Sequence, residues 1–333
     1  MNRKTARAWW VSPWLWLPPG LLLVYLALRG VPLGEVVQVL AGLNLAQILA
    51  LMAVNLLILG CFTLRWWLIV NAQGFPVPFH QVFLYRLAAF GVNYFTPGPQ
   101  FGGEPLQVAL LNRRHAMPLT AATAAVTLDR LVELSINFGF LAFGIVSSLR
   151  FPVFAGLPPL QLSLLGFGLL ALPLGYLSLL WLGWTPLGSL LGRSVDRWQL
   201  PAAIQKAAGF VYSSERHISN FFRRHPAPTA AAVLVSLAGW GLIVLEFGLT
   251  LRFLGLEFSA VQVVAVLTAA RLAFLAPTPA GLGVLEGALL LAITALGGAP
   301  AYAVSLALLI RGRDISLGVL GLGWLALSLR RSD

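Results

Sequence analysis

The sequence predicts an all-α, polytopic integral membrane protein with about six full spans, two re-entrant hairpins of broken helix and an inverted internal repeat. Of its 333 residues, 59% are hydrophobic and 10% are charged, and the mean hydropathy is +0.85. A soluble domain carries about 25% charged residues. Apolar runs long enough to enter a bilayer recur along the chain, and two of them are broken by proline and glycine. The composition excludes a water-soluble globular enzyme.

The apolar segments define the expected helices, because a bilayer core of ~30 Å requires ~20 helical residues. The first segment follows three basic residues, Arg3, Lys4 and Arg7, and no small-residue cleavage site follows it. We therefore expect an uncleaved first helix with a cytoplasmic N-terminus. The segments lie at 14–28, 45–70, 80–95, 118–148, 158–182, 228–254, 259–276, 284–297 and 300–329.

Two of these segments, 80–95 and 259–276, are short and run into clusters of proline and glycine. Proline removes a backbone donor and glycine adds flexibility, so each helix must break there. Irregular backbone at membrane depth survives only where protein or a water-filled cavity satisfies it. The expected hinge residues are Pro97, Pro99, Gly102 and Gly103 in the first segment, and Pro277, Pro279, Gly281 and Gly283 in the second.

The two broken segments resemble each other. Residues 85–90 read Tyr-Arg-Leu-Ala-Ala-Phe and residues 270–274 read Ala-Arg-Leu-Ala-Phe, and each segment continues through Pro-x-Pro and two glycines to a glutamate. Broken segments at corresponding places in two halves indicate an internal repeat with a central site. We treat 1–333 as a single transmembrane domain with halves at about 1–182 and 228–331.

The basic residues predict the orientation. If each broken segment returns to the side from which it enters, every basic cluster falls on the cytoplasmic side. The first hairpin then enters from the cytoplasm and the second from outside, as an inverted repeat requires. We expect the chain in the cell membrane with both termini in the cytoplasm. The net charge of +11 then reflects basic cytoplasmic segments and their attraction to anionic lipid headgroups, and we expect no nucleic acid to be bound. The clusters are Arg113 and Arg114, the basic residues of 183–227, and Arg330 and Arg331.

The linker at about 186–227 has two interpretations. Apolar residues recur in it at helical spacing, with basic residues on the other faces, which is typical of a helix lying on the cytoplasmic leaflet. A solvated basic loop that only fixes topology is the alternative. The recurring apolar residues are Ile204, Val211, Ile218 and Phe222.

Ionisable residues within the apolar segments are the candidate site. Each costs at least ~2.5–3.5 kcal/mol on insertion scales, so such groups face a cavity or one another. Glu246, Arg313 and Asp314 belong to this set. Our substrate-binding candidates are Arg86, Asn93, Glu104, Asp129, Arg130, Glu133, Arg271, Glu286 and Arg311.

Helical spacing predicts some pairs among these charges. Asp129 and Glu133 share one stripe of a helix, Arg130 can reach Glu133 at i+3, and Arg311 can reach Asp314 likewise. Such pairs can lock helices together with no further function. Glu104 and Glu286, each just beyond a helix break, favour a functional role, although a glutamate there can also cap free backbone donors.

The same residues allow two kinds of ligand. Two helix N-termini facing a midplane cavity, with Arg86 and Arg271 nearby, suit an anion such as a phosphate headgroup. The buried acids suit a cationic headgroup or proton transfer. Composition does not decide between these. The single cysteine, Cys61, excludes a disulfide framework, and the four scattered histidines predict no metal or other cofactor.

The motifs resemble a known family. The stretch 93–107, with Pro-Gly-Pro and Gly-Gly-Glu-Pro, is followed by Leu-Asp-Arg-Leu-Val-Glu at 128–133, and a second signature spans 277–286. Together they resemble the flippase-like membrane family related to the transmembrane flippase domain of lysylphosphatidylglycerol synthases. That resemblance implies a lipid-handling protein whose polar motif positions are Glu104, Asp129, Arg130 and Glu286, with Arg311 in the C-terminal helix motif.

Two departures from the family pattern bear on the substrate. Gln107 stands where many members have an arginine, so either Arg113 or Arg114 replaces that cation or the substrate differs. The resemblance does not extend to the soluble aminoacyl-transfer domain of those synthases. We therefore expect no synthesis of an aminoacylated lipid by this chain.

Three functions compete. The first is a lipid translocase that moves a polar or charged headgroup across the cytoplasmic membrane through a central polar cavity, without enzymatic activity. The second is a non-transporting accessory subunit of a lipid- or glycolipid-modifying synthase. The third is a membrane-embedded transferase using a lipid phosphate, which is disfavoured because no two acids lie within three residues of each other. The expected partners are membrane lipids with a charged headgroup and a lipid-modifying synthase; the sequence does not give the oligomeric state.

Overall fold

The computed structural model describes residues 17–96, 102–154, 156–276, 278 and 281–330. These residues form α-helices, one 3₁₀-helix at Pro152–Phe154 and no strand, which confirms the all-α prediction. The α-helices are α1 (Leu17–Leu28), α2 (Leu33–Ala41), α3 (Leu45–Ala72), α4 (Phe79–Phe95), α5 (Gly103–His115), α6 (Leu119–Ser148), α7 (Pro159–Trp181), α8 (Pro186–Trp198), α9 (Ala202–Arg224), α10 (Pro226–Phe253), α11 (Ala260–Ala273), α12 (Val284–Ala295) and α13 (Pro300–Arg330).

Local sequence explains where most helices begin. A proline lies at the N-cap or in the first turn of α2, α4, α6, α7, α8, α9, α10 and α13, where its missing N–H costs nothing. The helices α3 and α11 begin instead with capping boxes, Asn44 with Gln47 and Ser259 with Gln262.

Five of the expected full spans are long helices. Among the described residues, the four helices α3, α6, α7 and α10 are long and apolar enough to cross a membrane, and α13 has 31 residues although it carries four charged residues. The remaining expected span, at 14–28, is described from Leu17 as the 12-residue α1. The short amphipathic helix α2 was not predicted.

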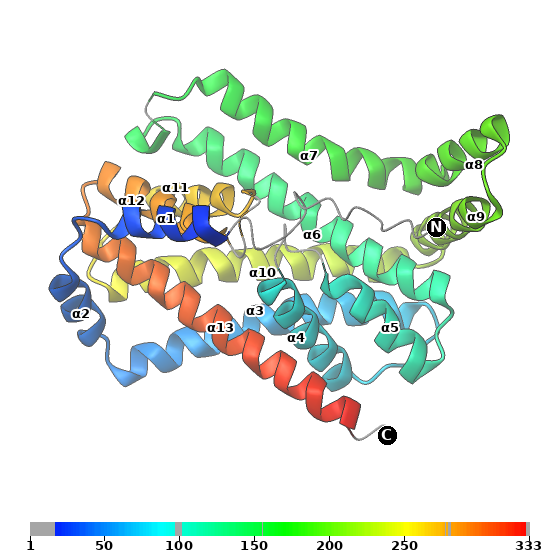
Figure 1. Cartoon of the computed structure of the whole chain (residues 1–333), viewed down its shortest axis with the longest axis horizontal. Coiled ribbons are helices and arrows are strands. Elements are labelled where there is room, and N and C mark those ends of the chain that lie inside the picture. The colour runs from blue at the N-terminus through cyan, green and yellow to red at the C-terminus, as the bar shows by residue number, and fades with distance from the viewer. Residues whose placement is uncertain (1–16, 97–101, 155, 277, 279–280, 331–333) are drawn as a thin grey trace, which may run out of the picture.

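The two halves repeat one arrangement in opposite directions. The order of a long helix, a two-helix hairpin and a second long helix holds for α3–α6 and again for α10–α13. Figure 1 shows α3 antiparallel to α10 and α6 antiparallel to α13, with the hairpin α4–α5 opening toward one end of the molecule and α11–α12 toward the other. This arrangement agrees with the inverted repeat expected from the sequence.

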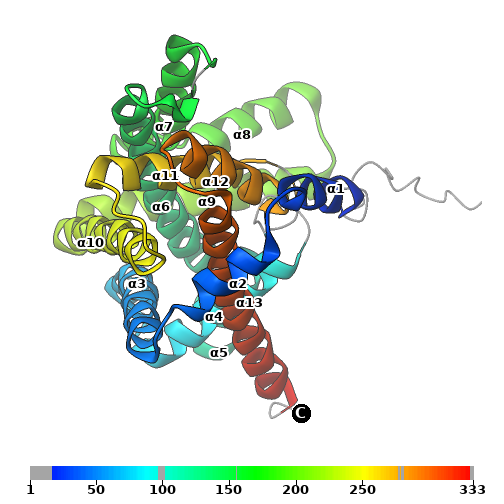
Figure 2. The same ribbon diagram turned by 90° about the vertical axis from the view of Figure 1, so that its left-hand side faces the viewer.

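The halves pack crosswise. The helix α3 lies against α10, α4 against α13, and α11 against α6, and Figure 2 shows α3 beside α10 and α4 beside α13 in end view. One apolar core is built mainly from the first half and another from the second, and Ile136 of α6 packs against both. Each hairpin is therefore held by the last helix of the opposite half.

Small residues permit this crosswise packing. A Cβ at Gly321 of α13 would collide with the carbonyl oxygen of Leu87 on α4, and one at Gly91 would lie 2.6 Å from the carbonyl oxygen of Gly318. The α6–α11 contact is equally close, because a Cβ at Gly144 would collide with the Thr268 side chain. Close backbone approach through glycine is typical of helix packing in membranes.

The linker is helical, so the solvated-loop alternative is wrong. The helices α8 and α9 form a hairpin, and α9 packs on α6 and α7. Of the predicted apolar stripe, Ile218 and Phe222 are buried in this contact, whereas Ile204 is exposed. The stripe thus serves protein packing at one end of α9 and leaves only its other end available to a lipid surface.

The end of the molecule that holds α8 and α9 also holds the end of α5 and the end of α13 (Figure 1). Basic residues close α5, α9 and α13 there: Arg113, Arg114, Arg223, Arg224 and Arg330. The clustering at one end agrees with the distribution from which we predicted a cytoplasmic face.

We expect Gly321→Ala to lower the melting temperature of the purified protein, because the new methyl group must push α13 away from α4. Overpacking of this kind costs about 1–3 kcal/mol. The matched control is Gly323→Ala, two residues away on the same helix, where a Cβ meets no atom within 4 Å. Equal melting temperatures for the two variants in the same detergent would contradict the close α4–α13 contact.

Candidate functional site

The first break places Asn93 and Glu104 across from each other. The Asn93 Oδ1 accepts a hydrogen bond from the Gly103 N–H at 2.6 Å, and the Glu104 Oε2 accepts one from the Gly102 N–H at 3.1 Å. These two side chains satisfy backbone donors at the start of α5, which otherwise lack partners. A Cβ at Gly103 would collide with the backbone of Ala89, so glycine is required where α5 turns back along α4.

The second break has the same chemistry with a sharper turn. Gly281 and Gly283 have φ of +69° and +79°, a region that L residues rarely enter. The Glu286 Oε2 accepts a hydrogen bond from the Gly283 N–H at 2.8 Å. Both expected glutamates therefore cap a helix start, and each also meets an arginine of the following long helix. The expected hinge residues Pro97, Pro99, Pro277 and Pro279 lie outside the described residues.

Asp129 is the centre of the first charge cluster. Its Oδ1 accepts a hydrogen bond from the Arg65 Nε at 2.6 Å, and its Oδ2 accepts one from the Arg86 Nη2 at 2.6 Å. Arg65 is fully buried, and the Asp129 side chain is 7% exposed. One carboxylate thereby joins α3, α4 and α6. Charge-assisted bonds of this length are among the stronger ones in proteins.

The cluster continues along α6 toward the first break. The Arg65 Nη2 donates to the Glu133 Oε2 at 2.9 Å, the Arg130 Nη1 donates to the Glu133 Oε1 at 3.1 Å, and the Arg130 Nε lies 3.5 Å from the Glu104 Oε1. The predicted Arg130–Glu133 pair is confirmed. We call the set the first charge cluster; it contains three arginines and three acids and is formally neutral: Arg65, Arg86, Arg130, Glu104, Asp129 and Glu133.

The second half holds two separate groups of charges. The Arg311 Nε donates to the Glu286 Oε1 at 3.0 Å. The Arg313 Nε donates to the Asp314 Oδ1 at 2.8 Å, and its Nη1 lies 3.3 Å from the Glu246 Oε1. The predicted Arg311–Asp314 pair is therefore wrong: α12 packs beside α13 and presents Glu286 to Arg311, leaving Asp314 to its neighbour in sequence.

Asn55 of α3 links the second half to the first. Its amide donates to the Glu246 Oε1 at 3.4 Å, and its carbonyl oxygen accepts from the Arg313 Nη1 at 3.2 Å. We call Asn55, Glu246, Arg313 and Asp314 the second charge cluster. It contains two acids and one arginine and carries a formal charge of −1.

Arg271 belongs to none of these pairs. Its guanidinium lies over the Trp240 ring at 4.8 Å from the centroid, and Trp240 stacks on Phe140 of α6. No hydrogen bond or ion pair joins Arg271 to another described residue. In the first half, Arg86 lies over the Trp66 ring at 5.6 Å in the same manner, but it also binds Asp129.

Accessibility separates the charges into two groups. Glu104, Arg130, Glu133 and Arg313 keep 22–29% of their side-chain surface accessible. The side chains of Arg86, Asp129, Glu246, Glu286 and Arg311 keep 7–12%. A partly accessible ionised group can exchange its partner for a ligand as the helices stand, whereas a closed one can do so only after the helices around it move apart.

Sequence reasoning missed Arg65. It is the one charged residue in the 28 residues of α3, and a lone arginine in an apolar span marks a buried acidic partner. That signal was present in the sequence. Its partners, 64 and 68 residues away on α6, could not be read from spacing.

Arg113 and Arg114, the residues expected to replace a cation at Gln107, lie in the last turn of α5. They are about 9–11 Å beyond Gln107 along the helix at 1.5 Å per residue. Arg114 stacks on the rings of Tyr85 and Trp324. The cation that faces Glu104 is Arg130 of α6.

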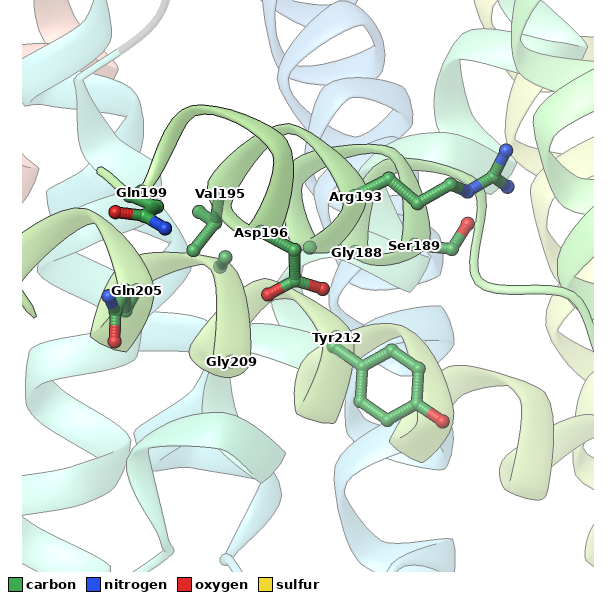
Figure 3. A pocket seen from close by; sticks show the side chains of 11 residues that line it. Gly188, Ser189, Arg193, Val195, Asp196, Gln199, Gln205, Gly209 and Tyr212 are labelled. Atoms are coloured by element: carbon green, nitrogen blue, oxygen red, sulfur yellow. The ribbon is translucent and has the colours of Figure 1, made fainter.

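A separate groove of about 880 Å³ lies between α8 and α9 (Figure 3). Its floor contains small residues, and its polar side chains include Arg193, Asp196, Gln199, Gln205 and Tyr212. None of the predicted site residues lines it. The groove is therefore distinct from the charge clusters in the helical bundle.

A buried carboxylate supports the α8–α9 hairpin. Glu215 of α9 accepts hydrogen bonds from the backbone N–H groups of Leu187 and Gly188 at 2.9 and 2.8 Å, and from the Tyr176 hydroxyl. The negative charge satisfies the N-terminal donors of α8, which is favourable at the positive end of a helix. This acid is structural.

The family follows from comparison with known sequences. The profile described as the lysylphosphatidylglycerol synthase TM region matches residues 10–321. This chain belongs to that family. It is 29% identical over 109 residues to a UPF0104 membrane protein of Methanothermobacter thermautotrophicus and 24% identical over 111 residues to one of Methanocaldococcus jannaschii. Each match covers 33% of this chain and about a third of the relative (32% and 33%). No solved structure matched the chain.

We expect Arg65→Gln to destabilise the folded protein by about 3–5 kcal/mol, because it leaves Asp129 and Glu133 short of a buried cationic partner. Thermal unfolding in detergent measures the effect. The control Arg252→Gln removes an exposed arginine near the end of α10 and should change stability by no more than about 0.5 kcal/mol. A native melting temperature for Arg65→Gln would show that the first charge cluster does not hold the helices.

Proposed function

We propose that this protein is a lipid translocase that moves a polar or charged headgroup across the cytoplasmic membrane through a polar pathway between its two halves. The observation that carries the proposal is the set of partly accessible charges beside the first broken helix, Glu104, Arg130 and Glu133. Membership of the family of the lysylphosphatidylglycerol synthase TM region supports a lipid substrate.

The charge arrangement suits transport of a headgroup. A lone charge in a bilayer costs at least ~2.5–3.5 kcal/mol, but a headgroup that enters a chain of arginines and acids can exchange one ionic partner for another. Glu104, Arg130 and Glu133 form such a chain at the first break, and all three stay partly accessible. Exchange of partners lowers the barrier without leaving any ion unpaired.

The two hairpins offer a route for alternating access. Each begins its second helix at a glycine held by a glutamate, and each packs on the last helix of the other half. Movement of one half against the other would open the charges to one side and then to the other, as in transporters with inverted repeats.

The proposed setting is the cell membrane with the basic end in the cytoplasm, and therefore with the C-terminus and the α8–α9 hairpin on the cytoplasmic side. The partners are lipids with a charged headgroup. The proposal assigns no enzymatic activity to the chain.

An accessory role remains the second candidate, because the family is described as the membrane region of a synthase. In that role the chain would position a lipid for a separate lipid-modifying synthase. Transport by the purified chain alone separates the two: an accessory subunit gives none until the synthase is added.

We expect Glu104→Gln and Glu286→Gln each to reduce transport by more than tenfold while the protein stays folded. Glutamine keeps an oxygen that can cap the Gly102 or Gly283 N–H, but it loses the charge that faces Arg130 or Arg311. The assay reconstitutes the pure protein in liposomes with labelled lipids of different headgroup charge. It measures accessibility to an impermeant quencher, with and without a pH gradient.

The matched control is Glu257→Gln, which removes an exposed acid between α10 and α11. It should leave transport unchanged. Full transport by both Glu104→Gln and Glu286→Gln would overturn the site assignment. No movement of any lipid by the wild-type protein would overturn the translocase proposal and favour the accessory role.

A further inference from the structure

The two halves place an arginine at corresponding positions. Arg86 lies on α4 and Arg271 on α11, the first helix of each hairpin, and each guanidinium stacks on a tryptophan of the long helix before it. The equivalence extends to the helices that follow. Arg130 on α6 pairs with the capping glutamate of α5, just as Arg311 on α13 pairs with the capping glutamate of α12.

This correspondence of positions shows where the two halves differ. If Arg130 corresponds to Arg311, then Glu133 corresponds to Asp314, because both lie three residues further on. The residue before Arg130 is Asp129, and the residue before Arg311 is Ile310. In the first half that aspartate neutralises the stacked arginine at 2.6 Å. In the second half the position is apolar and buried, and the stacked arginine has no carboxylate.

Among the described residues, Arg271 is consequently a cation that contacts an aromatic ring but has no hydrogen-bonded or ion-paired partner. Arg271 is partly accessible, and it forms no hydrogen bond or ion pair with another described residue. The charges within electrostatic range of it come from both halves: Glu133 from the first charge cluster, and Glu246, Arg313 and Asp314 from the second. Arg271 thus lies between the two charge clusters.

Trp240 adds a second unfilled donor at the same place. The tryptophan is 6% exposed, and its indole N–H has no acceptor among the described residues. A buried donor without an acceptor costs about 1–3 kcal/mol. An anion bound to the Arg271 guanidinium would lie close to the Trp240 ring, and one of its oxygens could accept this N–H.

We propose that Arg271, stacked on Trp240, binds the phosphate diester of the lipid that the protein moves, with the phosphate taking the place that the Asp129 carboxylate has in the first half. The inference rests on the proposed function, in which the ligand is a lipid whose headgroup passes the charge clusters. A phosphate diester carries one negative charge, as the aspartate does, and its two free oxygens match the fork of a guanidinium.

The neighbouring acids would bind the other end of the same headgroup. Bound phosphate would lie beside Glu133, Glu246 and Asp314, which favour a cationic group on the far side of the phosphate. The site therefore fits a headgroup with a phosphate toward Arg271 and a positive or hydroxylated end toward the acids. Because Arg86 is already neutralised, it takes no part in this recognition.

The test measures lipid binding separately from transport. The purified chain in detergent is titrated with phosphatidylglycerol, with diacylglycerol of the same acyl chains, and with inorganic phosphate as a competitor, and native mass spectrometry counts the bound lipids. The variants are Arg271→Gln, which removes the charge, and Arg271→Lys, which keeps the charge but not the fork. The control is Arg252→Gln on the exposed end of α10.

We expect Arg271→Gln to weaken phosphatidylglycerol binding by at least about tenfold, in line with the loss of a hydrogen bond to a charged group. Arg271→Lys should recover part of the affinity, the control should match the wild type, and diacylglycerol binding should not change. If Arg271→Gln does not yield folded protein, the phosphatidylglycerol affinity of Arg271→Lys is compared with that of the wild type, since both keep the positive charge. A weaker affinity in Arg271→Lys supports the inference, and an equal affinity contradicts it.

Equal phosphatidylglycerol affinity in wild type and Arg271→Gln would overturn the inference, as would equal loss of diacylglycerol binding. Displacement of the lipid by inorganic phosphate at similar concentration would show a site for free phosphate and would also overturn it. The outcome is independent of the transport assay. If the protein transports lipid but its lipid binding does not depend on Arg271, the translocase proposal stands and the Arg271 site is wrong. If lipid binding depends on Arg271 but the protein does not transport lipid, the site stands and the translocase proposal is wrong.

Discussion

The bidentate hold of Asp129 on two arginines is the interaction on which the first half depends. Its two oxygens bind Arg65 and Arg86 at 2.6 Å each, and these bonds join the long helices α3 and α6 to α4, the first helix of the first hairpin. On a solvent-exposed surface such a pair would contribute little to stability. Within an apolar bundle the alternative is an unpaired ion, which is far more costly. The carboxylate therefore fixes the positions of α3, α4 and α6 relative to one another.

The first charge cluster has a closed part and a partly accessible part. The Arg65 side chain is closed to solvent and that of Asp129 almost so, whereas Glu133, Arg130 and Glu104 are partly accessible. The same six charges can thus stabilise the fold in one part and remain exchangeable in the other. This division connects the packing of the bundle with the proposed passage of a polar headgroup.

The inverted repeat gives the two halves the same skeleton but different electrostatics. In the first half the charges sum to zero within one cluster. In the second, Glu286 and Arg311 form a pair of low accessibility, the second charge cluster carries an extra negative charge, and Arg271 contacts the Trp240 ring but forms no ion pair with another described residue. The missing carboxylate at Arg271 follows from one replacement in register, Asp129 against Ile310. Divergence at one buried position can therefore turn a structural arginine into a binding one.

Glycine and charge act at different helix contacts in this architecture. The crosswise contacts of α4 with α13 and of α6 with α11 require glycine at Gly91, Gly321 and Gly144, because the helices approach closely there. The ion pairs of the first charge cluster instead join α3, α4 and α5 to α6. Glycine therefore sets how the two halves pack, and the first charge cluster holds the helices of the first half together.

The sequence by itself determined the class, the helices and the breaks. Hydropathy and proline placed most helix ends within three residues, and the repeated glycine and glutamate motifs located both hinges, because these signals are local. It also identified the local Arg130–Glu133 pair. Only the tertiary structure decided the other partners: Arg65 with Asp129, Arg311 with Glu286 rather than Asp314, and Arg271 with an aromatic ring. Helical spacing restricts pairing to residues three or four apart, whereas these contacts depend on which helices pack together and how closely glycine lets them approach.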